Sequence, residues 1–259
     1  MNWRRRPGTR ATVGVMALAG ALGAVGIASG GPPPTVITGG GELSPSTLPK
    51  NKLAPAALTV RINAETTNPS GVPDPMTNVL LNFDDDGTVT TKGLPICTRN
   101  LENTTTAVAK SRCRSSLIGT GIAHALIPAS PEPVTTTAQV SLFNGPKRGG
   151  NPTILLHNRA DIGITVVLTG VIRNSTFGAD FGKALDVTVG TLPAGAVFSD
   201  IRTTVKKTWK FRGKKMSYIS ASCHDRNRKL NVHGVFKVTI GGQSQTQTGD
   251  VVQTCRVKR

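Results

Sequence analysis

The sequence predicts an all-β protein, an antiparallel β-sandwich of jelly-roll or immunoglobulin-like type with one short helix. Apolar and polar residues alternate along most segments instead of following a helical period. In residues 57–65, for example, Leu58, Val60 and Ile62 lie on one side of an extended chain and polar residues lie on the other. About a dozen such segments occur, mostly separated by turn residues, which is typical of a sandwich or barrel. The further candidate strands are residues 78–83, 117–127, 138–145, 153–160, 162–175, 184–192, 200–211, 216–223, 229–240 and 248–255.

Residues 1–30 predict a signal peptide. Four arginines precede an uncharged apolar run, and small residues at 28–30 come before three prolines at 32–34. A retained transmembrane anchor is the alternative, because about twenty apolar residues can span a bilayer. The run is rich in Gly and Ala, however, and the prolines end it. We therefore expect cleavage, no retained transmembrane helix, and a protein that is secreted or associated with the cell envelope.

The next 25 residues, 31–55, are rich in Pro, Gly, Ser and Thr and show no apolar period, which favours a flexible linker or pro-segment. The β-sandwich domain then covers residues 56–259, a length that all-β domains commonly reach undivided. Two smaller β domains with a boundary near residues 175–195 are the alternative. Residues 101–116 break the alternation and fit the one short helix, with Asn103 as its N-cap.

The net charge of +17 is concentrated in the C-terminal quarter. Residues 31–200 carry thirteen basic and twelve acidic residues, whereas residues 201–259 carry fourteen basic and two acidic ones. A field of this sign attracts anionic polymers, lipid headgroups or nucleic acid. The alternative is a solvated surface on which Lys and Arg protect strand edges.

Aromatic and basic residues interleave in residues 206–218. In a strand, Trp209 and Phe211 would share one face, and Lys210 and Arg212 would share the other. The segment either binds an anionic envelope polymer or lipid headgroups, or is a strand with a buried apolar face and a solvated basic face. Nucleic acid is the least expected of these partners for an exported chain. The candidate anion-binding residues are Lys206, Lys207, Lys210, Arg212, Lys214 and Lys215.

The chain has four cysteines, an even number that indicates disulfides in an exported protein. Of the three connectivities, Cys97 with Cys113 and Cys223 with Cys255 is the simplest, because each pair brackets one supersecondary unit. A zinc site is the alternative, but it would favour cysteines that are close together in sequence, and none are.

Three consecutive aspartates, Asp84, Asp85 and Asp86, precede Gly87. They could bind calcium, but the twelfth position of an EF-hand loop counted from Asp84 is Pro95, which has no carboxylate. We expect a tight Asp-Gly turn that joins the strand at 78–83 to the next strand as a hairpin. No cofactor or metal is expected.

A Lys-Gly-Leu-Pro-x-Cys motif at residues 92–97 is followed by the helical segment, by Cys113 and by an Ile-Gly-Thr-Gly strand at 118–121. Residues 142–157 and 209–225 continue the pattern. This order resembles a family of uncharacterised secreted proteins of soil actinobacteria. The resemblance implies export, two cysteine pairs and a β-rich body, and it assigns no catalytic residue.

The remaining candidates for chemistry are dispersed. The four histidines, at positions 124, 157, 224 and 233, form no metal-binding motif, and the chain has no G-x-S-x-G nucleophile motif. These patterns predict a secreted or envelope-associated, non-catalytic protein in a structural or binding role that contacts anionic surface polymers through its basic C-terminal quarter. A secreted hydrolase with a dispersed active site is the alternative.

Overall fold

The computed structural model describes residues 34–225 and 228–258. The predicted signal peptide, residues 1–30, lies outside this range. Within the described residues, no helix has both the length and the apolar character needed to cross a membrane.

The described chain is mainly strand, with one short α-helix, α1 (Thr106–Arg112), and two 3-10 turns at Arg114–Ser116 and Pro193–Gly195. The strands of the first half are β1 (Thr35–Ser44), β2 (Thr47–Leu48), β3 (Ala54–Thr66), β4 (Met76–Asp84), β5 (Gly87–Val89), β6 (Leu117–Ile127), β7 (Val134–Arg148) and β8 (Asn151–Ala160). Those of the second half are β9 (Thr165–Asn174), β10 (Phe181–Thr188), β11 (Val197–Val205), β12 (Thr208–Phe211), β13 (Lys214–Ser217), β14 (Ile219–Ala221), β15 (Lys229–Ile240), β16 (Gln243–Thr254) and β17 (Arg256–Val257).

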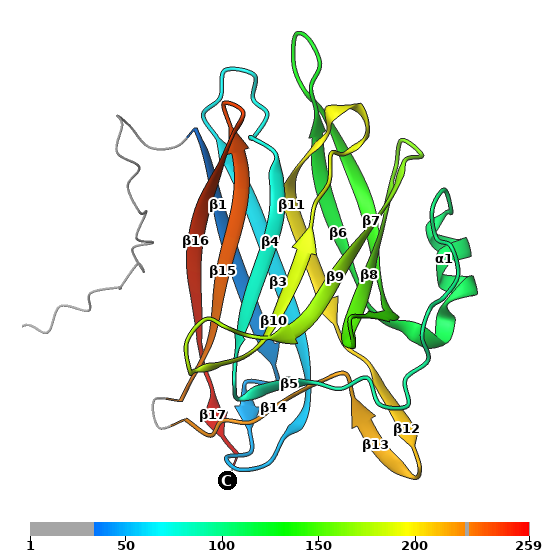
Figure 1. The fold of residues 1–259 in the computed structure, drawn as a ribbon, viewed down its shortest axis with the longest axis vertical. Coiled ribbons are helices and arrows are strands. Elements are labelled where there is room, and N and C mark those ends of the chain that lie inside the picture. The colour runs from blue at the N-terminus through cyan, green and yellow to red at the C-terminus, as the bar shows by residue number, and fades with distance from the viewer. Residues whose placement is uncertain (1–33, 226–227, 259) are drawn as a thin grey trace, which may run out of the picture.

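Thirteen strands form one sheet in the order β16-β15-β4-β10-β9-β8-β7-β6-β11-β3-β14-β5, with β1 paired to β3. The sheet curls back on itself, so that β1 lies beside β16 from the other end of the order (Figure 1). The predicted all-β, antiparallel, sandwich-like fold with one short helix is confirmed. Strands β6 to β10 are neighbours in chain order, which is a meander and not the Greek key of jelly rolls and immunoglobulin domains.

The main core fills the space inside the curled sheet, where the alternating apolar side chains of its strands meet. Tyr218 and Phe236 are among its largest fully buried side chains. A second, smaller core lies on the outer face of β7 and β8, where α1 covers Phe143. The protein therefore has one large interior and one helix-covered patch.

The prediction of a flexible linker at residues 31–55 is wrong for its described part. Strand β1 pairs with β3 in an unbroken register from Thr35 opposite Thr66 to Ser44 opposite Ala57. One of its glycines, Gly39, serves packing here, because a Cβ atom at this position would lie 3.2 Å from the ring of Phe236. The glycine-rich composition of this segment suggested a flexible chain. The physical reason for glycine at position 39 is instead the close approach of β1 to Phe236.

A division of the domain near residues 175–195 is also not observed. Strand β10 occupies that region and pairs with β9 on one side and β4 on the other. Beyond the expected boundary, β11 pairs with β3 and β6, and β15 pairs with β4, so strands from both sides of it belong to a single sheet.

The helix is shorter than the predicted range of 101–116. Its N-cap is Thr105, whose hydroxyl accepts a hydrogen bond from the backbone N–H of Val108 at 3.3 Å, and not Asn103. Asn103 instead adopts a positive φ of 54° in the preceding turn. Asparagine tolerates that left-handed conformation better than most residues, which explains its place there.

The turn at Asp85 and Asp86 is present, but the predicted hairpin is not. Strand β5, which follows the turn, pairs with β14, whereas β4 pairs with β10 and β15. The Asp-Gly signal therefore located the turn correctly but gave the wrong partner for the strand that follows.

Candidate functional site

Strands β12 and β13 form a separate two-stranded sheet, which we call the basic hairpin (residues 206–217). It projects from the end of the molecule where β5, β14 and the C-terminus lie (Figure 1). In its register Trp209 lies opposite Met216, and Lys210 lies opposite Lys215. Trp209 and Phe211 therefore share one face, as the sequence predicted, and the two lysines share the other.

The aromatic face attaches the basic hairpin to the turn at residues 91–94. The indole Nε1 of Trp209 donates a hydrogen bond of 3.1 Å to the carbonyl of Lys92. The ring of Phe211 occupies the space beside Gly93, where an added Cβ atom would lie 2.1 Å from the ring. The guanidinium group of Arg212 lies 5.4 Å from the centroid of the Phe211 ring, within the range of a cation–π contact.

The predicted anion-binding residues are brought together on this hairpin, but they do not share one face. Lys214 lies opposite Phe211 on the aromatic side, and Arg212 stands in the turn. Five of the six are exposed to solvent, and Lys207 is half-buried. Within residues 34–225 and 228–258, none of the six forms an ion pair.

Both predicted disulfides are present. Cys97 is bonded to Cys113, and Cys223 is bonded to Cys255. The first fixes the loop after β5 to the end of α1, and the second ties the segment after β14 to the end of β16. No cysteine in the described chain is free, so the zinc alternative has no thiolate ligand.

Carboxylates of Asp84, Asp85 and Asp225 lie with one oxygen each within 4.8 Å of one another, which is the geometry a cation could use. Asp84 is 4% exposed and accepts hydrogen bonds from the backbone N–H of Asp86 and from the backbone and side chain of Asn231. Burial outweighs these bonds and raises the pKa of Asp84 to about 6. Sequence reasoning missed Asp225, because nothing local places it beside residues so distant in the chain.

Asp86 has a structural role beside the second disulfide. Its carboxylate accepts hydrogen bonds from the Ser222 hydroxyl at 2.7 Å and from the backbone N–H of His224 at 2.8 Å. It thus holds the segment on either side of Cys223 against the turn after β4. Of the three consecutive aspartates, Asp84 and Asp85 therefore belong to the carboxylate cluster, and Asp86 holds the segment around Cys223 in place.

The four histidines serve separate parts of the fold. His233 is hydrogen bonded to Asp250 at 2.7 Å and stacks on the ring of Phe177 at 3.6 Å, and His124 is 3.1 Å from Asp200. The carboxylate cluster includes no histidine. His233 and His124 therefore have separate partners and do not share a site.

The pair nearest to a nucleophile and base is Ser141 and His157, directly opposite each other on β7 and β8. Both are 0% exposed beneath α1, and the Ser141 hydroxyl and His157 Nδ1 have no hydrogen-bond partner in the described chain. The other ring nitrogen of His157 lies 3.1 Å from the hydroxyl and the carbonyl of Thr104. Burial lowers the pKa of His157, and the closed surroundings give a substrate no access to the pair.

Comparison with models of known protein families, with curated proteins and with solved structures gives no match to this chain. The function must therefore be inferred from the chain's own geometry. Of the arrangements described above, the basic hairpin alone combines a fixed position, exposure and uncompensated charge of one sign.

Proposed function

We propose that the protein is secreted or associated with the cell envelope and has a non-catalytic binding role, in which the basic hairpin contacts anionic surface polymers or lipid headgroups. The observation that carries the proposal is the direct opposition of Lys210 and Lys215 on an exposed face. Like charges directly opposite each other destabilise an antiparallel pair. A bound anion between them would remove that repulsion.

The surroundings of this pair favour an external anion over an internal one. A second like-charged pair, Arg61 opposite Arg202, occurs on β3 and β11, but Asp200 lies two residues from Arg202 on the same strand. Around the basic hairpin, by contrast, the chain has no acidic residue between positions 201 and 224. The counter-charge for Lys210 and Lys215 is therefore absent from their own segment.

The attachment of the hairpin also supports binding. Trp209 and Phe211 hold it against the 91–94 turn, so the lysines are presented on a fixed support. A preorganised surface loses less conformational entropy when it binds than a flexible tail does. The C-terminal quarter, with fourteen basic and two acidic residues, adds a long-range field that attracts a polyanion.

Two observations support the export that this role requires. The N-terminal pattern is that of a signal peptide, and two disulfides are typical of proteins that fold in oxidising compartments. An envelope polymer or a lipid headgroup is the class of anion available there.

The test is retention on immobilised heparin in a salt gradient, with the double variant Lys210→Gln and Lys215→Gln. We expect this variant to elute at clearly lower salt, because two opposed charges on the contact face are lost. The matched control is Arg61→Gln with Arg202→Gln, which removes the same charge from another opposed pair, and we expect its elution to change little. Equal losses of heparin retention in the two double variants would show that retention depends on net charge alone and would contradict a specific site.

A further inference from the structure

An open pocket of about 560 Å³ lies among the loops at the end of the molecule opposite the basic hairpin (Figure 1). The loops that connect β3 to β4 and β10 to β11 supply most of its lining, together with the adjoining ends of β4 and β11. Buried apolar side chains, among them Met76, Leu192 and Phe198, form part of this lining. The volume is in the range of small-molecule sites, which is about 300–1,000 Å³.

Asp74 is the one charged residue among the described residues that line the pocket. Its Oδ2 accepts hydrogen bonds from the Thr35 hydroxyl at 2.6 Å and from the side-chain amide of Asn68 at 3.2 Å. The Thr35 hydroxyl also accepts a hydrogen bond of 2.7 Å from the backbone N–H of Asp74. Because Thr35 is 0% exposed, a buried neighbour fixes the orientation of the carboxylate.

The other carboxylate oxygen of Asp74, Oδ1, is available to a ligand. It forms no hydrogen bond with the described chain and is not one of that chain's buried polar atoms without a partner, so solvent reaches it. Asp74 also forms no ion pair within residues 34–225 and 228–258. The pocket therefore presents an accessible oxygen of a fixed carboxylate that has no internal counter-charge.

The side chains of the lining have few hydrogen-bond donors left for a ligand. Both amide hydrogens of Asn68 are used, on the Val72 carbonyl and on Asp74, and the Thr77 hydroxyl donates to the Lys237 carbonyl. The remaining hydroxyls can donate or accept, and prolines have no N–H group. The lining prolines are Pro73, Pro75 and Pro128. Such a lining suits a ligand that brings its own donors.

Most of the positive charge of the protein is remote from this pocket. Strand β15 runs between the two ends of the molecule (Figure 1), and its 12 residues span about 40 Å. The field of an exposed charge is screened within about 8 Å at physiological ionic strength. Lys237 is the basic residue nearest in sequence to a lining residue, but it is exposed and does not line the pocket.

The five loops at this end contain three acidic residues and no lysine or arginine. The acidic residues are Asp74, Glu132 and Asp161. The loops are residues 67–75, 128–133, 161–164, 189–196 and 241–242. The local field at the pocket therefore favours a cation, in contrast to the field at the basic hairpin.

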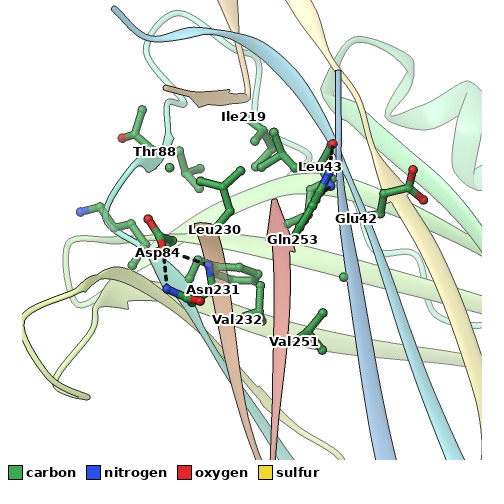
Figure 2. A pocket seen from close by; sticks show the side chains of 16 residues that line it. Glu42, Leu43, Asp84, Thr88, Ile219, Leu230, Asn231, Val232, Val251 and Gln253 are labelled. Atoms are coloured by element: carbon green, nitrogen blue, oxygen red, sulfur yellow. Dashed lines mark hydrogen bonds between the residues drawn. The ribbon is translucent and has the colours of Figure 1, made fainter. Parts of the chain in front are cut away.

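The space beneath β1 and β16 is unsuited to such a ligand. Its volume is about 70 Å³, whereas a cavity that takes up benzene has about 150 Å³. Asp84 and Asn231, in its wall, are hydrogen bonded to each other (Figure 2). It therefore lacks the room that the pocket beside Asp74 provides, and this polar pair is satisfied internally.

We propose that the pocket beside Asp74 binds a small organic ammonium ion, which is a primary amine on an apolar body. The ammonium group donates a hydrogen bond to Oδ1 of Asp74, and the apolar body packs against Met76, Leu192 and Phe198. A hydrogen bond between two ionised groups is about twice as strong as a neutral one. The carboxylate is already held in position, so little conformational entropy is lost on binding.

The test is an NMR titration of the full, disulfide-bonded protein at neutral pH with 2-phenylethylamine, which is then protonated, and with its neutral isostere 2-phenylethanol. We expect saturable shifts of the methyl groups of Met76, Val189 and Leu192 with the amine. The amine should bind about five- to tenfold more tightly than the alcohol, between the effects of an exposed ion pair and of a hydrogen bond to a charged group.

The variant Asp74→Asn should lose this preference. Its remaining carbonyl oxygen can still accept the hydrogen bonds from Thr35 and Asn68, while an N–H donor replaces the free oxygen. The matched control is Asp161→Asn, which removes the same charge from the same end of the molecule. The Asp161 carboxylate likewise accepts a hydrogen bond from a threonine hydroxyl, that of Thr136, but it does not line the pocket. We expect the control to keep the preference for the amine.

The comparison of the two probes on the wild-type protein requires no substitution, so it decides the matter even if Asp74→Asn does not fold. Absence of methyl shifts with the amine, or equal affinity for the amine and the alcohol, would overturn the proposal. A preference that survives in folded Asp74→Asn, or one that Asp161→Asn abolishes equally, would assign the effect to general charge and would overturn it as well.

Discussion

The side chain of Gln253 binds both backbone groups of Leu43 on the neighbouring strand. Its Oε1 accepts a hydrogen bond from the Leu43 N–H at 2.6 Å, and its Nε2 donates one to the Leu43 carbonyl at 2.8 Å. Gln247 makes the equivalent bridge further along, from the N–H of Ile37 and to the carbonyl of Thr35. Two amide side chains thus satisfy part of the free edge of β1 and close the curled sheet.

Replacement of Gln253 by Ala should weaken this closure. We expect a loss of about 1–3 kcal/mol in the free energy of unfolding, because two hydrogen bonds of roughly 0.5–1.5 kcal/mol each are removed. Urea unfolding followed by circular dichroism measures the change. Gln245→Ala is the matched control, since Gln245 lies on the same face of β16 and its side chain forms no hydrogen bond in the described chain. A similar loss in the control would show that the bridge is not the cause.

The pH dependence of stability should reveal Asp84. Its pKa is raised to about 6 in the folded protein, against 3.8 ordinarily, so the folded state binds the proton more tightly than the unfolded state does. The stabilising contribution is therefore complete below about pH 4 and is lost as the pH rises through 6, by up to about 3 kcal/mol. Urea unfolding at pH 4.5 and 7.5 should show this loss in the wild type relative to Asp84→Asn. Parallel pH profiles for the two proteins would contradict the assignment.

The two disulfides should contribute separately to stability. They join residues 16 and 32 positions apart, and the entropy of loop closure assigns about 3 and 4 kcal/mol to loops of these lengths. We expect Cys97→Ala with Cys113→Ala to lower the melting temperature slightly less than Cys223→Ala with Cys255→Ala. Differential scanning calorimetry provides the comparison. An unchanged melting temperature in either double variant would mean that the disulfide does not restrict the unfolded chain.

The features predicted correctly from the sequence are those that depend on local pattern. The alternation around Leu58 identified β3, and the bracketing of supersecondary units identified both cysteine pairs. The paired faces of the basic hairpin followed from the spacing of Trp209 and Phe211. In each case the information lies within a few residues or in a single spacing.

The features that were missed depend on contacts between distant segments. Strand β1 looks like a linker because it is rich in glycine, and one of these glycines, Gly39, lies against the ring of Phe236, nearly 200 positions away. Asp225 joins Asp84 and Asp85, which lie about 140 positions earlier in the chain. The periodicity of apolar residues and the spacing of motifs carry no information on contacts between segments that are distant in the sequence.

The attachment of the basic hairpin should depend on Gly93. It has a φ of +74°, and any Cβ atom there would overlap the Phe211 ring, so Gly93→Ala should release the hairpin from the 91–94 turn. We expect the fluorescence of Trp209 to shift toward that of an indole in water and heparin elution to move to lower salt. The matched control is Gly213→Ala, which has a nearly equal φ of +75° but no atom within 4 Å of the new Cβ, so it has the backbone strain without the overlap. If the two variants behave alike, backbone strain alone is responsible and the contact between Phe211 and Gly93 does not hold the hairpin in place.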